Sequence, residues 1–204
     1  MDTILNEVCV LVTAAFALTL VPGFRRQERS LLSGRDQGTA LLVFLVLGLV
    51  EEVTVSHAGW LNERIVAVCA AGLVAGPWVG LAVSGFVTWL AVAHHGLPLG
   101  SIATSMLCGG LVGGCLYRWH PKLAQHPLTG FGLTLAASLL RGGLFFLYAP
   151  SSQLALNRLE EIGMAPVLQG LGTALILAIV EQFVAKTNKH EQQLRLRCAL
   201  SKHA

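Results

Sequence analysis

The sequence predicts an all-α membrane protein: a polytopic bundle of about six hydrophobic segments with a re-entrant helical hairpin broken at Gly-Pro. Composition is the first reason, because 54% of the 204 residues are hydrophobic and 12% are charged, about half the charged fraction of a soluble domain. The second reason is a series of apolar stretches that approach the roughly 20 residues a helix needs to cross a bilayer. The third is a helix breaker near the middle of the stretch over residues 65–93. Most of the protein surface is therefore expected to face lipid.

Short loops rich in turn residues separate the expected spans. The first candidate lacks a basic leading region and a small-residue cleavage site, so we interpret it as a span rather than a signal peptide. The loops leave no room for a second domain, and we expect one transmembrane domain over residues 1–186 and a cytoplasmic helical tail over 187–204. The candidates are Ile4–Val21, Thr39–Ser56, Ile65–Ala93, Ser101–Leu116, Leu128–Ala149 and Ala165–Ala185.

Lys and Arg in the short loops predict the orientation. Four arginines follow the first segment and place that loop in the cytoplasm. Arg118 and Lys122 follow the fourth segment, and five basic residues follow the last. Both groups would lie outside if residues 65–93 crossed once, and inside if this segment entered and left on one face. Parity therefore favours a hairpin with Arg64 and His94 on the external side, and a cytoplasmic C-terminus.

Glycines and a proline explain how the segment can turn. Pro77 has no backbone donor and clashes with the preceding turn, so a bend there costs little. Irregular backbone at membrane depth is tolerated only where protein or a water-filled cavity covers it. Small residues four apart let helices approach closely. The expected hairpin and packing positions are Gly72, Gly76, Pro77, Gly80, Gly109 and Gly113. The alternative is a kinked, tightly packed helix without a ligand.

Ionisable residues within spans usually face the interior of a bundle. Arg141 lies midway along the fifth segment with only apolar and glycine neighbours, whereas Glu51 and Glu52 lie near the outer end of the second. A carboxylate partner would offset much of the cost of a buried guanidinium. We therefore predict that Arg141 pairs with Glu51 or Glu52, and the alternative is a direct role in ligand binding.

Several function classes find no support in the residues. The net charge is +3, and no basic patch interleaved with aromatic residues predicts a nucleic-acid partner. The five cysteines form no C-x-x-C pair, and the His94-His95 pair has no acidic or sulfur ligand at metal spacing. No catalytic motif is present. We expect no metal, no cofactor and no catalysis in this chain.

Four sequence stretches resemble the LytS-type five-transmembrane receptor region, the membrane sensor of LytS-type histidine kinases. They are N-E-R-I-V with A-G-L-V-A-G-P-W-V-G, then S-M-L-C-G-G-L-V-G-G, A-P-V-L-Q-G-L-G-T-A-L and V-P-G-F-R-R. The resemblance implies a sensory input module for small external signals, pyruvate among them, or for the state of the cell envelope. It also implies a multi-pass protein of the bacterial inner membrane, a homodimer, and a downstream kinase or other output domain outside this chain.

The resemblance also implies a ligand pocket at the hairpin entrance. The Arg of the family's N-x-R pattern is kept as Arg64, and a family Ser is kept as Ser105. With His94 at the hairpin exit, these residues form the implied ligand-binding set, and a guanidinium suits a small carboxylate. The alternative for Arg64 is a side chain that snorkels at the membrane interface.

Other family positions differ in this chain. The second Arg of pyruvate-sensing relatives falls at Ala91, and a following Cys falls at Ile102. The acidic residue typical of the fifth segment falls at Ser138, and the family's Asn-x-x-Gly begins at Gln169. The resemblance therefore implies the fold throughout and the pyruvate pocket only in part.

Three functions remain open at this stage. The first is a receptor in which a ligand shifts the glycine-rich helices between two packings and moves the last span. The second is a small solute transporter or transporter subunit, since broken helices also mark transport sites. The third is a structural membrane-assembly protein, for which the small-residue faces alone would suffice.

Overall fold

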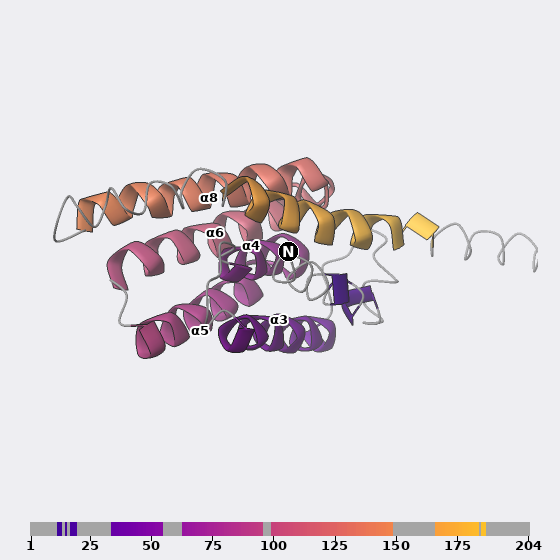
Figure 1. The fold of residues 1–204 in the computed structure, drawn as a ribbon. Coiled ribbons are helices and arrows are strands. Elements are labelled where there is room, and N and C mark those ends of the chain that lie inside the picture. The colour runs from indigo at the N-terminus through magenta and orange to yellow at the C-terminus, as the bar shows by residue number, and fades with distance from the viewer. Residues whose placement is uncertain are drawn as a thin grey trace, which may run out of the picture.

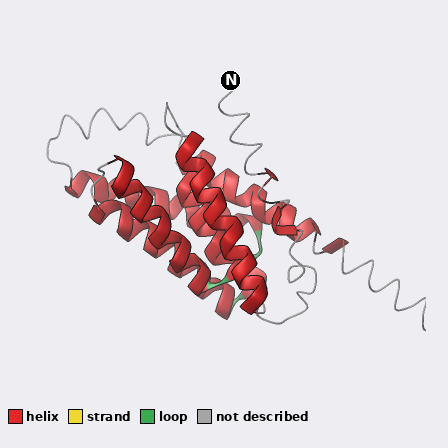
Figure 2. Ribbon diagram, turned by 90° about the horizontal axis from the view of Figure 1, so that it is seen from below, coloured by secondary structure: helices red, strands yellow, loops and turns green. Residues whose placement is uncertain are grey.

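The computed structural model describes residues 12–13, 15, 17–19, 34–54, 63–95, 99–148, 166–183 and 185–186. These residues are helical apart from the short links between helices, and Figure 2 shows no strand among them. The helices are α3 (Gly34–Thr54), α4 (Glu63–Ala75), α5 (Pro77–His95), α6 (Leu99–Trp119), α7 (Pro121–Ala124) and α8 (Pro127–Tyr148), followed by a C-terminal helix, Pro166–Phe183. The predicted all-α bundle is confirmed.

The helices follow the predicted segments closely. The largest difference is at α3, which begins at Gly34 rather than Thr39. Asp36 lies in the first turn of α3, where the positive end of the helix dipole stabilises a carboxylate. The segment predicted over 65–93 divides into α4 and α5 at Gly76. The first predicted span, Ile4–Val21, and the tail over 187–204 lie largely or wholly outside the described residues.

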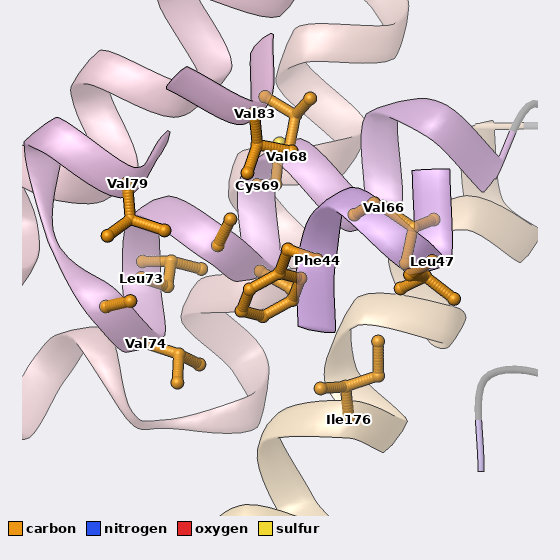
Figure 3. Close-up of a cluster of buried hydrophobic side chains, with 14 of the residues drawn as sticks. Phe44, Leu47, Val66, Val68, Cys69, Leu73, Val74, Val79, Val83 and Ile176 are labelled. Atoms are coloured by element: carbon orange, nitrogen blue, oxygen red, sulfur yellow. The ribbon is translucent and has the colours of Figure 1, made fainter. Parts of the chain in front are cut away.

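In Figure 1 the bundle has three layers, with α8 and the C-terminal helix above, α4 and α6 between, and α3 and α5 below. Helix α4 packs against α3, α5, α6 and α8, and every residue from Arg64 to Gly76 is buried. A helix that is apolar on all sides belongs in a core. Figure 3 shows its side chains meeting those of Phe44 from α3, Val83 from α5 and Ile176 from the C-terminal helix.

The outer faces of the bundle are apolar. Leu42 of α3, Trp89 of α5 and Leu139 of α8 expose 62%, 64% and 54% of their surface. By length and composition, Pro166–Phe183 can cross a membrane, and shorter apolar stretches occupy 36–50, 64–75 and 77–93. Scattered exposed apolar side chains are normal in any protein. Here, however, they lie on the helices that surround α4, which is buried from Arg64 to its end. This arrangement suits a lipid environment.

Candidate ligand site

The chain turns between α4 and α5 at a single residue. Gly76 has φ +96°, a conformation that glycine adopts without a Cβ penalty. Its amide donates to Gly72 O at 3.0 Å, and its carbonyl accepts from Gly80 N at 3.0 Å. Pro77 begins α5, where a missing N–H removes no helical hydrogen bond. The helix breaker therefore leaves the backbone around the turn well hydrogen-bonded, and the predicted Gly-Pro hairpin is confirmed.

The two arms of the hairpin touch through glycines, and α6 lies against both. A Cβ added at Gly80 would lie 2.9 Å from Gly72 Cα and 2.7 Å from Gly110 O. A Cβ at Gly114 would overlap the backbone of Pro77. At these positions the three backbones approach so closely that side chains would hold them apart. All six predicted hairpin and packing positions lie in or beside this contact, which we call the glycine junction.

The register of α6 against α4 follows from two of these contacts. An added Cβ at Gly109 would lie 3.0 Å from Cys69 Sγ, and four residues later one at Gly113 would lie 3.2 Å from an amide nitrogen in the next turn of α4. The two helices therefore run parallel in equal steps. One turn back along α6, Ser105 lies at the same height as the residue after Arg64. The structure thus brings two predicted ligand-binding residues to one level.

Both of these residues are inside the bundle. Arg64 is 5% exposed and Ser105 is fully buried, with its hydroxyl donating to Ile102 O at 3.0 Å. A snorkelling arginine would carry its guanidinium to the surface, so the burial of Arg64 favours an interior role. Ala91 and Ile102 are also buried, which leaves apolar side chains at two positions where the resemblance implies polar ones.

His94 lies further out than the hairpin geometry was expected to place it. Gly72 and Gly80 are equally distant from Gly76, so the antiparallel arms bring Thr88 of α5 level with Arg64. His94 is six residues beyond Thr88, about 9 Å further along α5 at 1.5 Å per residue. The arms are unequal because α4 has 13 residues and α5 has 19. The side chain of His94 is outside the described residues, so its contact with a ligand stays a prediction.

A buried polar contact joins α8 to the C-terminal helix. Ser138 Oγ donates to Gln169 Oε1 at 2.6 Å, and one turn along, the hydroxyls of Thr134 and Thr173 are 2.7 Å apart. All four side chains are buried. We call these two pairs the polar rungs. The sequence showed Ser138 and Gln169 only as separate departures from the family pattern, although equal spacing of four residues on both helices was a signal that could have joined them.

The polar rungs are linked to α4. Thr134 makes a side-chain hydrogen bond with Cys69. Helix α8 runs antiparallel to α4, because it is antiparallel to α6 along the contacts that Leu133 and Ala137 make with the α6 glycines. One turn beyond Thr134, the Ser138–Gln169 rung therefore comes level with the start of α4, close to the height of Arg64.

Five buried polar residues from five helices thus lie at similar positions along the bundle axis, within about one helical turn, or 5.4 Å, of one another. We call this set the polar layer: Arg64 of α4, Thr88 of α5, Ser105 of α6, Ser138 of α8 and Gln169 of the C-terminal helix. Among the residues that the structure describes, Thr88 Oγ1 and Gln169 Nε2 are the buried side-chain polar atoms without a hydrogen-bond partner. Both belong to the polar layer.

Arg141 lies near this layer on α8. Ala137 packs on Gly109, with 3.6 Å between the alanine Cβ and a Cβ added at the glycine, and Arg141 follows one turn later, half-buried. Helix α8 packs on α6 and α4, whereas α3, which carries Glu51 and Glu52, packs on α4 and α5. The side chains of both glutamates are outside the described residues, so their pairing with Arg141 stays a prediction.

A separate cavity lies at the other end of α4. It is small and is lined by Val74, Gln125, Leu177, Val180 and Glu181. Its walls are mostly apolar and its one ionisable group is a carboxylate, so it does not suit an anion. No cluster of three His, Cys, Asp or Glu side chains that could hold a metal occurs in the described part of the chain.

Comparison with known proteins identifies the family. The family model described as "5TMR of 5TMR-LYT" matches residues 26–183, which include the hairpin, the glycine junction and the polar rungs. No curated protein and no solved structure matches the chain. Because the family match covers most of the sequence, this membrane protein belongs to the LytS-type five-transmembrane receptor family, whose members serve as the membrane sensory region of LytS-type kinases.

Proposed function

We propose that this chain is the sensory input domain of a LytS-type phosphorelay kinase and that it binds a small carboxylate at Arg64. The observation that carries the proposal is the burial of Arg64, which is 5% exposed, at the level of the fully buried Ser105. Ionisable groups inside membrane bundles mark functional sites more often than structural ones. A guanidinium offers two parallel donors to a carboxylate, and the Ser105 hydroxyl, whose one donor is bonded to Ile102 O, would donate to a further ligand oxygen only by exchanging that bond.

The length of the hairpin supports one orientation of the domain in the membrane. Helix α5 is about 28 Å long at 1.5 Å per residue, close to the hydrocarbon thickness of a bilayer. The elbow at Gly76 would then lie near the cytoplasmic face, beside Arg118 and Lys122, and the polar layer would lie toward the outer face of the membrane. The C-terminus would be cytoplasmic, in the inner membrane of a bacterium. The C-terminal helix would lead to the output domain of a homodimeric kinase, with cell-envelope control as one biological role.

Ligand binding to purified protein in lipid nanodiscs tests the proposal. Propionate, lactate, pyruvate and succinate would be titrated calorimetrically against the parent chain, Arg64→Lys, Arg64→Ala and the control Arg118→Lys. Arg118 is exposed at the end of α6, so its variant should bind as the parent does. Arg64→Lys keeps the charge but loses the two parallel donors, and we expect affinity to fall about 10-fold.

Two results would contradict the proposal. Equal affinity in the parent, Arg64→Lys and Arg64→Ala would remove Arg64 from any ligand site. Accumulation of the bound carboxylate inside proteoliposomes that contain the protein would instead indicate a transporter. A fusion to a reporter kinase then measures whether the bound ligand changes phosphorylation.

A further inference from the structure

The polar layer contains two hydrogen-bonding groups that the protein leaves unused. Gln169 is 1% exposed and Thr88 is 7% exposed, yet Gln169 Nε2 and Thr88 Oγ1 have no partner. Buried polar atoms are nearly always paired, because leaving one unpaired forfeits its hydration without replacement. The other buried hydroxyls with printed contacts, such as Ser84 to Leu81 O at 2.9 Å, are satisfied. The two exceptions come from α5 and the C-terminal helix, and by the register of the packed helices both lie within about one helical turn of the height of Arg64.

We propose that Gln169 and Thr88 donate hydrogen bonds to the small carboxylate that Arg64 holds. This inference rests on the proposed function, because it concerns the same polar layer. A carboxylate has about four lone-pair positions, and a guanidinium fork occupies two of them. An amide N–H and a hydroxyl supply donors for the remaining positions or for a second oxygen on the ligand. Neither adds a charge, which suits a site that already holds one buried cation.

The hydrogen bond between Gln169 and Ser138 bears on how a ligand bound to Gln169 would affect signalling. Its Oε1 is fixed by Ser138 of α8 at 2.6 Å, so the side chain is held while Nε2 is still available. A ligand accepting from Nε2 would be joined to the C-terminal helix directly and to α4 through Arg64. The ligand would thereby connect the hairpin to the helix that leads out of the domain.

A purely structural role for Gln169 predicts different behaviour. In that case Gln169 would serve only to hold α8 and the C-terminal helix together, as Thr173 does with Thr134. Replacing Gln169 would then lower thermal stability without changing the affinity of the folded protein for a ligand. A ligand-binding role predicts the opposite pattern.

The experiment compares Gln169→Leu, Thr88→Val and the control Thr173→Val in nanodiscs, with calorimetric titration of propionate, lactate, pyruvate and succinate. For the carboxylate that binds the parent most tightly, Gln169→Leu and Thr88→Val should each weaken affinity about 3- to 10-fold, the value of one hydrogen bond. Thr173→Val should leave affinity unchanged, because its rung is one turn outside the polar layer. The melting temperature of ligand-free Gln169→Leu should change little, because the loss of the bond to Ser138 is offset by removal of the unpaired Nε2.

The outcomes separate this inference from the proposed function. Loss of affinity in Arg64→Lys together with parental affinity in Gln169→Leu and Thr88→Val would overturn the inference and leave the Arg64 site standing. A lower melting temperature with unchanged affinity in Gln169→Leu would assign Gln169 a structural role and overturn it as well. Failure of all four carboxylates to bind the parent chain would refute both.

Discussion

Substituting Gly114 by alanine tests the tightest contact of the glycine junction. The new Cβ would lie 2.5 Å from Pro77 N and 2.7 Å from Pro77 Cβ, whereas ordinary contact begins at 3.4 Å. Relief requires α6 and the elbow to separate by about 1 Å, because the obstructing atoms are backbone and ring atoms that no rotamer change can move. That separation would also disturb the approach of Gly110 to Gly72 and Gly80.

The expected loss of stability can be worked out from two opposing effects. Overpacking of a close-packed interior costs about 1–3 kcal/mol, sometimes more, and backbone contact places this site at the upper end. Alanine in place of glycine returns about 1 kcal/mol through helix propensity. We therefore expect Gly114→Ala to lower the free energy of unfolding by about 2 kcal/mol.

Gly132→Ala on α8 is the matched control, because a Cβ there meets nothing within 4 Å. This variant should be neutral or more stable by about 0.4–1 kcal/mol. Unfolding in mixed detergent–SDS micelles, followed by circular dichroism, measures both. A Gly114→Ala variant as stable as Gly132→Ala would show that the junction is not tight, and the argument from glycine contacts would fail.

Two further predictions concern charges and topology. Arg141→Ala should lower stability by about 3 kcal/mol if it strands a buried carboxylate, and adding Glu51→Gln or Glu52→Gln should recover part of the loss; strictly additive effects in both double variants would exclude these partners. Single cysteines at Asn62 and His95 in a background without other cysteines should both react with a membrane-impermeant maleimide from outside intact cells, whereas labelling of His95→Cys only in inverted vesicles would contradict the hairpin topology.

The sequence was sufficient for the hairpin because its determinants are local. Gly76 adopts a conformation that few other residues tolerate, and Pro77 follows at a position where it does no harm. Gly72 and Gly80, each four residues from Gly76, then allow the arms to touch. Each of these properties belongs to a residue and its neighbours in the chain, so no knowledge of the surrounding helices was needed.

The polar layer could not be predicted in the same way. The joining of Ser138 to Gln169 depends on the register between two helices that are separated by a long connection. Likewise, the distance between Arg64 and His94 depends on the unequal lengths of α4 and α5, which a single apolar stretch does not reveal. The position of a residue along the bundle axis, relative to residues of other helices, depends on tertiary packing. The sequence identifies the residues but not these relative positions.

The contrast between the glycine junction and the polar rungs indicates where movement can occur. At the junction, α4, α5 and α6 meet backbone to backbone, so any sliding forces a collision such as that of Gly110 with Gly80. At the rungs, α8 and the C-terminal helix are joined by hydroxyls and an amide on rotatable side chains, which can exchange partners. The glycines beside them, Gly130 against Leu177 and Gly170 against Phe131, meet mainly side chains rather than backbone. The shift between two packings of the glycine-rich helices, with movement of the last span, stays a prediction. From these contacts we infer that α4, α5 and α6 would act as one rigid unit against which the C-terminal helix moves, with Gln169 at the point where a ligand on Arg64 would act on it.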